Sequence, residues 1–184
     1  MVEIAATDVR LRGAIAQCPL VDGLAGTKNV PLTRLLRLLS VGSLDKLGSL
    51  VGRPPIYITA SAAPGEFGAI ASADAIAGLS LIAPPEGTDW HNRVAARSLL
   101  GIGAHRPVRK AAKIHCPILL IVAETDTIAP IGPALHLAEC APKGQLYRSR
   151  GGHYGPYKGG EDHDNVVRVE IEFLHRHAAL SSAS

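Results

Sequence analysis

The sequence has few aromatic residues, few cysteines and no long apolar run, and each shortage excludes a class of protein. Aromatic residues make up 4% of the 184 positions, and the three cysteines include no Cys-x-x-Cys pair. A disulfide framework and a zinc finger are therefore excluded. Asp74 interrupts the longest apolar stretch, 67–83, which leaves no candidate membrane span. Because Glu3 and Asp8 stand where a signal peptide has a basic start, we expect a cytoplasmic protein.

Charged residues are also scarce, and their signs nearly balance. Lysine and arginine number 19, aspartate and glutamate number 16, and the basic residues are scattered along the chain. A nucleic-acid-binding protein gathers its basic residues into one face or stripe, so no nucleic-acid partner is expected. The 47% of hydrophobic residues is enough for a substantial core, which indicates a folded globular protein.

Three segments have the pattern of strands in a buried parallel sheet: 11–18, 118–123 and 145–149. The first two are nearly continuous apolar runs, which is typical of strands that are covered on both faces. Helical patterns at 132–140 and 165–177 follow the second and third segments. This alternation of strands and helices predicts an α/β fold.

The middle of the chain has a different and mostly helical pattern. Leucines recur at helical spacing within 32–50, and the segments 67–82 and 93–100 also predict helices. A short β-like run lies at 56–59. We therefore expect three parts: 1–22 as the start of the core, 23–106 as a helical insertion, and 107–184 as the rest of the core.

Two polar residues follow neighbouring predicted strands. Asp126 comes just after 118–123, and His153 comes just after 145–149. Loops at the carboxyl ends of parallel strands converge on one crevice, so we expect these side chains to lie close together. A carboxylate can fix the tautomer of an imidazole and stabilise its positive charge, which lets the histidine act as a general base. Glu124 is an alternative acid two residues earlier.

The sequence around these two residues resembles the α/β-hydrolase family. Its acid loop is similar to residues 116–130, which read Cys-Pro-Ile-Leu-Leu-Ile-Val-Ala-Glu-Thr-Asp-Thr-Ile-Ala-Pro, and its histidine loop is similar to 151–155, Gly-Gly-His-Tyr-Gly. The resemblance implies that 23–106 is the lid of this fold and that the chain supplies its C-terminal half. It also implies a hydrolase of carboxylic esters or related acyl bonds, acting on a small apolar molecule. Asp126 and His153 would be its catalytic residues, with no cofactor or metal ion.

The chain departs from the family in lacking the Gly-x-Ser-x-Gly turn that carries the nucleophile. Ser43, Ser49 and Ser61 lie in the lid-like region, and none has glycines at both required positions. In the family's order this turn would precede Met1, so the resemblance implies a truncated chain without its own nucleophile. The alternatives to a hydrolase are an acyltransferase that uses the same groups and a non-catalytic short product.

Three further patterns would support other chemistries. Residues 161–164, Glu-Asp-His-Asp, could hold a metal ion together with His153, but a charged run before a helix commonly stabilises its N-terminus instead. Cys18, at the end of a predicted strand, is an alternative thiol nucleophile, although no cationic residue adjoins it. Ser43 and Lys46 match the Ser-x-x-Lys pattern of penicillin-recognising enzymes, but that family's two companion motifs are absent.

The strand 11–18 forms one side of the predicted sheet. In the family it has a neighbour on both sides, and an open edge exposes apolar surface and unpaired backbone groups. We therefore expect either a marginally stable chain or a homo-oligomer that forms through this edge.

Overall fold

The computed structural model describes residues 1–28 and 30–177, which form two compact units. The core unit joins Met1–Asp22 to the chain from Arg106 onward, and the lid unit comprises Gly23–His105. Among the described residues, no helix is long and apolar enough to cross a membrane. The cytoplasmic location stays a prediction.

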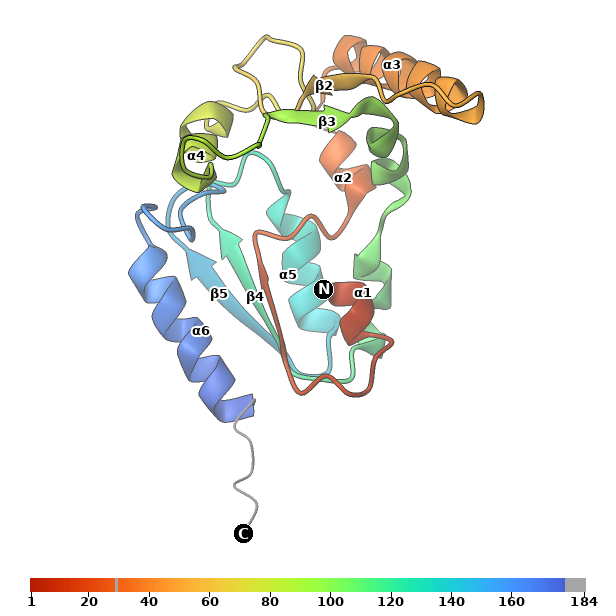
Figure 1. Cartoon of the computed structure of the whole chain (residues 1–184). Helices are drawn as coiled ribbons and strands as arrows, with labels where there is room; N and C mark the ends of the chain where they lie inside the picture. Colours follow the sequence, from red (N-terminus) through yellow and green to blue (C-terminus); the bar gives the residue numbers. More distant parts are fainter. Residues whose placement is uncertain (29, 178–184) are drawn as a thin grey trace. The chain divides into compact units, whose positions relative to one another are not determined.

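The core unit contains a parallel sheet of three strands. These are β1 (Ala14–Gln17), β4 (Ile118–Ala123) and β5 (Gly144–Ser149), in the order β1-β4-β5, of which β4 and β5 are labelled in Figure 1. The register pairs Ala14 with Ile118 and Ile118 with Gly144, so all three strands run in one direction from a common level. The predicted α/β fold with three parallel strands is thus confirmed.

Both faces of this sheet are covered, which explains the unbroken apolar run of β4. Ile118, Leu120 and Val122 pack in one cluster with residues of α1 (Val2–Ala5) and α5 (Ile131–Cys140). Leu119 and Ile121 point the other way and pack against α6 (His163–His177). Because successive side chains of a strand alternate between faces, all six residues of β4 are buried.

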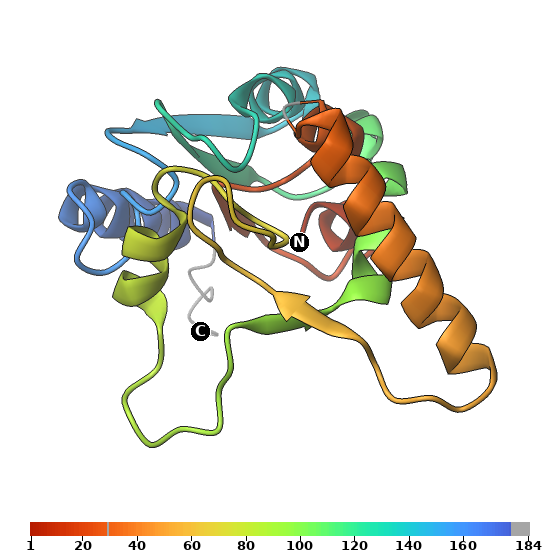
Figure 2. The ribbon, with the colours of Figure 1, turned by 90° about the horizontal axis from the view of Figure 1, so that it is seen from above.

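The lid unit is mostly helical but also contains a small antiparallel sheet. Its elements are α2 (Gly23–Thr27), α3 (Leu32–Leu50), β2 (Tyr57–Thr59), α4 (Ala75–Ile82), β3 (Arg93–Ala95) and the 3-10 helix η1 (Ala96–Ala104). Figure 2 shows α3 as the long orange helix of this unit. Its core packs Leu38 of α3 against Ile58 of β2 and Ala96 of η1. A second 3-10 helix, η2 (Pro107–Lys113), belongs to the core unit.

Two of the predicted helices are wrong. In both, the backbone at the start of the segment pairs with another part of the lid unit instead of forming a helix. The helix predicted at 67–82 begins only at Ala75. The residues before it pair with the chain after β2, as Ala69 N–H donates to Thr59 O at 2.9 Å and Ile70 N–H donates to Ala60 O at 2.8 Å. The helix predicted at 93–100 begins instead as β3, which pairs with β2. Tertiary pairing outweighs local helix propensity in both segments.

A buried carboxylate joins these elements inside the lid unit. The side chain of Asp45, on α3, is fully buried. It accepts hydrogen bonds from Ile56 N–H at 2.8 Å, from Arg97 N–H at 2.8 Å and from Arg97 Nε at 3.1 Å. Burial acts to raise the pKa of Asp45, but these hydrogen bonds and the Arg97 charge outweigh it and lower that pKa. Asp45 therefore fixes α3 against the starts of β2 and η1.

Candidate active site

The structure brings Asp126 and His153 into direct contact. Asp126 Oδ2 lies 2.9 Å from His153 Nδ1, which is hydrogen-bonding distance. The Asp126 side chain is 2% exposed and the His153 side chain 16%. Both residues follow strands that end side by side, since Ala123 of β4 pairs with Ser149 of β5. The two side chains that the sequence predicted to converge are thus a buried pair.

The Asp126 carboxylate is held by the backbone of its own loop. Its Oδ1 accepts hydrogen bonds from Ile128 N–H at 2.8 Å and from Ala129 N–H at 2.7 Å, which leaves Oδ2 for the imidazole. Glu124, the alternative acid, is exposed. Of the two carboxylates, Asp126 is therefore the one that is held against His153.

The loop that carries His153 is tightly folded and rich in glycine. Gly151 has a φ of +80°, a backbone conformation that side-chain-bearing residues rarely adopt. A Cβ on Gly155 would collide with the carbonyl of Arg150. The Tyr154 ring meets the His153 ring edge-on at 5.1 Å, and the Tyr157 ring lies 6.3 Å away. These contacts restrict the imidazole on the sides that Asp126 does not cover.

A second buried carboxylate, Asp162, closes this loop onto α6. It accepts hydrogen bonds from Asn165 Nδ2 at 2.8 Å, from Tyr147 Oη at 3.1 Å and from Arg150 N–H at 3.2 Å. Burial acts to raise the pKa of Asp162, but the hydrogen bonds outweigh it and lower that pKa from 3.8 to about 2. This role of Asp162 could not be predicted from the sequence, because its partners lie on both sides of the loop, at Tyr147, Arg150 and Asn165.

Among the described residues, the acidic run 161–164 does not form a group of side chains close enough to share a metal ion. The side chains that do are Cys18, Asp126 and His153, whose candidate ligand atoms lie within 4.8 Å of one another. Asp126 Oδ2 and His153 Nδ1 already face each other at 2.9 Å, so the pair is arranged for a hydrogen bond.

Cys18 adjoins this pair but is a poor nucleophile. It follows β1, has a φ of +39°, and is 6% exposed. Burial, and next the negative charge of Asp126, raise the pKa of the Cys18 thiol to about 12. The reactive form of cysteine is the thiolate, so Cys18 stays inert near neutral pH. Its position against Asp126 could not be read from the sequence, which places it only at a strand end.

No serine in the described residues is placed to serve this pair from within the core unit. Among the described residues of the core unit, Ser149 is the single serine, and it is fully buried. Ser43, Ser49 and Ser61 belong to the lid unit, where Ser43 and Ser49 lie on α3.

Comparisons with known proteins identify the fold. No protein-family model matches the chain. The chain is 35% identical over 172 residues to the quorum-quenching protein AidA of Acinetobacter baumannii (strain MDR-ZJ06), covering 94% of this chain and 56% of AidA. Its structure matches the α/β hydrolase GrgF of Penicillium sp. sh18 with a TM-score of 0.74 and 23% identity, over 97% of this chain and 60% of GrgF. The chain has part of the α/β-hydrolase fold.

A further solved structure matches more distantly. The monoacylglycerol lipase of Paleococcus ferrophilus matches with a TM-score of 0.58 and 19% identity, over 94% of this chain and 62% of the lipase. The chain thus spans about 60% of the length of these three proteins. The family resemblance predicted from residues 116–130 and 151–155 is confirmed at the level of the fold.

The thiol environments predict a simple reactivity pattern. Cys140 is exposed, whereas Cys18 and Cys116 are buried and burial raises both of their pKa values. We expect Ellman's reagent at pH 7.5 to modify one thiol rapidly and the other two only after unfolding in guanidinium. A Cys140→Ser variant should have no rapidly reacting thiol. Rapid modification of Cys18 in the folded chain, located by peptide mass spectrometry, would contradict the assignment of an inert thiol.

The depressed pKa of Asp162 predicts a pH-dependent contribution to stability. Because this pKa is about 2 in the folded chain and ordinarily 3.8, the stabilisation is complete above about pH 4 and is lost as the pH falls toward 2. We expect Asp162→Asn to lower the free energy of unfolding in urea by about 1–2 kcal/mol at pH 7 and by less at pH 3.

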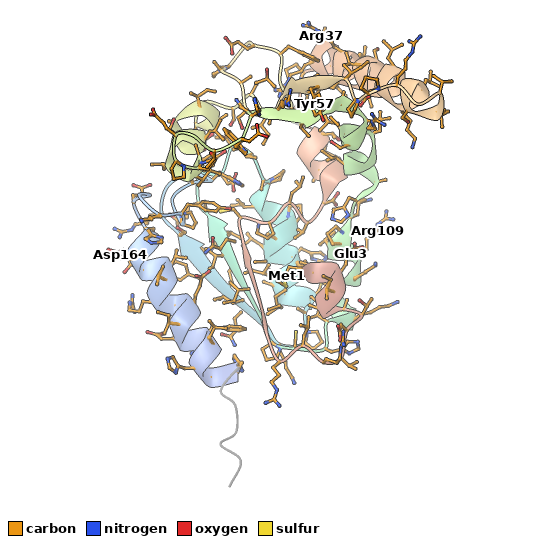
Figure 3. All side chains as sticks on the ribbon, in the orientation of Figure 1. Met1, Glu3, Arg37, Tyr57, Arg109 and Asp164 are labelled. Atoms are coloured by element: carbon orange, nitrogen blue, oxygen red, sulfur yellow. The ribbon has the colours of Figure 1, made fainter. Side chains whose placement is uncertain are left out.

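Asp164→Asn is the matched control for this measurement. Asp164 lies two residues away at the start of α6, is exposed, and is labelled in Figure 3. Its substitution should change the unfolding free energy by less than about 0.5 kcal/mol. Equal effects of the two variants at pH 7 would show that Asp162 does not anchor the loop.

Proposed function

We propose that Asp126 and His153 are the acid and base of a hydrolase that cleaves a carboxylic ester or related acyl bond. The observation that carries the proposal is the 2.9 Å contact between Asp126 Oδ2 and His153 Nδ1, at the carboxyl ends of adjacent parallel strands. This is the place where open α/β sheets hold their reacting groups.

The geometry assigns a role to each nitrogen of the imidazole. Nδ1 faces the carboxylate, so with Asp126 ionised it carries the proton and donates to Oδ2. Nε2 then has a lone pair that can accept a proton from an attacking hydroxyl. The imidazolium formed in that step is stabilised by Asp126, whose side chain is almost entirely shielded from water.

The nucleophile in this proposal comes from outside these 184 residues. The longer relatives support this, because the chain spans 56% of AidA and 60% of GrgF. A serine hydroxyl would attack the substrate carbonyl while His153 Nε2 takes its proton, and the alcohol would leave with that proton. Water would then hydrolyse the acyl-enzyme by the same route and regenerate the serine.

The proposed substrate is a small apolar molecule with an ester-like bond. The names of the relatives support a small molecule: one similar protein is described as quorum-quenching and a similar structure is a monoacylglycerol lipase.

The DNA that precedes the Met1 codon provides the test. We expect its reading frame to encode a Gly-x-Ser-x-Gly turn, and the protein translated from the longer frame to hydrolyse p-nitrophenyl esters. His153→Ala should lower kcat/KM by about 10³-fold or more, because the general base is lost. His115→Ala, which removes an exposed histidine of the same unit, should leave kcat/KM within about twofold.

Three results would overturn parts of this proposal. Full activity of His153→Ala would remove the assigned base. An upstream frame without the serine turn would favour a non-catalytic short product. Specific labelling of a serine in the 184-residue chain by a fluorophosphonate probe would show that the nucleophile is internal.

A further inference from the structure

Helix α3 carries a second apolar stripe on the side opposite the lid core. Leu38, Gly42 and Asp45 are its buried residues. At 100° per residue, the opposite side carries exposed leucines at helical spacing. Those leucines, exposed by 43% to 72%, are Leu32, Leu36, Leu39, Leu47 and Leu50. Leu44 and Val51, exposed by 62% and 74%, widen the stripe.

The charges of α3 point to a protein partner and not to an anionic lipid surface. Helices that lie on such surfaces direct lysine and arginine at the lipid head groups. Two of the three basic side chains of α3 are instead engaged within the lid unit. Arg34 donates to the carbonyls of Gly68 and Ala69 at 2.9 Å, and Arg37, labelled in Figure 3, lies 4.0 Å over the ring of Phe67.

The stripe is nearly the same when read from either end of the helix. In an antiparallel pair of α3 helices centred between residues 41 and 42, Leu36 of one copy lies opposite Leu47 of the other. Leu39 of one copy is level with Leu44 of the other, on the two flanks of the interface, and Ser40 is level with Ser43, so that small side chains stand at the centre. A two-fold interface requires this self-complementarity, because each surface must fit itself.

We propose that a second copy of this chain covers the stripe, through antiparallel packing of the two α3 helices. The accessible surface area of the stripe fits this partner. Its seven apolar side chains are exposed by roughly 60%, which amounts to about 700 Å² of surface per copy. Each partner of a standard interface buries ~800 Å². The proposal is independent of the acid–base pair in the core unit.

Sedimentation velocity of the 184-residue chain between about 1 and 100 µM tests the oligomeric state. We expect a monomer–dimer equilibrium, and we expect Leu36→Glu with Leu47→Glu to weaken it at least 100-fold. The matched control is Ile171→Glu with Leu174→Glu, which adds the same charges to exposed positions of α6. The control should dimerise like the unchanged chain. Circular dichroism melting of all the variants checks that each is folded.

Cysteine cross-linking tests the antiparallel direction. In a Cys140→Ser background, Leu32→Cys and Leu50→Cys stand about 27 Å apart on one helix, too far for a disulfide within one copy. Oxidation should give a covalent dimer whose disulfides join 32 to 50, identified by peptide mass spectrometry. Disulfides that join 32 to 32 would show a parallel arrangement and overturn the proposal.

Other occupants of the stripe give different results. A chain that stays monomeric at 100 µM would overturn the proposal, and leucine-dependent binding to phosphatidylglycerol vesicles would then identify a lipid surface. A dimer that persists in Leu36→Glu with Leu47→Glu would place the interface elsewhere, with the edge of β1 as the next candidate, and would equally overturn the role of α3.

Discussion

The in-register parallel pairing of β4 with β5 is the constraint on which the contact between Asp126 and His153 depends. Six consecutive residue pairs, from Ile118–Gly144 to Ala123–Ser149, end both strands at one level. The acid loop and the histidine loop therefore leave the sheet side by side. Glu124 N–H donates to Ser149 O and Thr125 N–H donates to Gly151 O, both at 3.0 Å, which extends the pairing into the loops. A shift in register would separate the two side chains.

Burial acts to raise the pKa of both Asp162 and Cys18 beside this sheet, and their other contacts decide the net direction of each shift. Asp162 is buried with three good donors, so its charged form is favoured and its pKa falls to about 2. Cys18 is also buried, and burial, followed by the negative charge of Asp126, raises its pKa to about 12. The Cys18 thiol beside Asp126 and His153 is thereby kept uncharged near neutral pH.

The parts of the structure that were predictable from the sequence are those set by local pattern. The apolar run of β4 and the positions of Asp126 and His153 after adjacent strands are local signals, and the structure places them together. The roles of Cys18, Asp45 and Asp162 depend on partners distant in sequence; Asp45, for example, binds Arg97 52 residues away. The wrong helix at 93–100 has the same origin, because pairing with β2 decides the conformation of that segment.

Two surfaces could bind another chain: the edge of β1 in the core unit and the leucine stripe of α3 in the lid unit. They differ in the kind of contact that each can offer. Among the described residues β1 pairs with β4 alone, and its four residues offer only a few backbone hydrogen bonds to a new strand. The stripe on α3 is longer and mostly apolar, and it needs no strand register to be buried. Association through α3 would use none of the residues of β1. The apolar surface of α3 therefore suits a second copy, and the backbone edge of β1 suits extension of the same sheet.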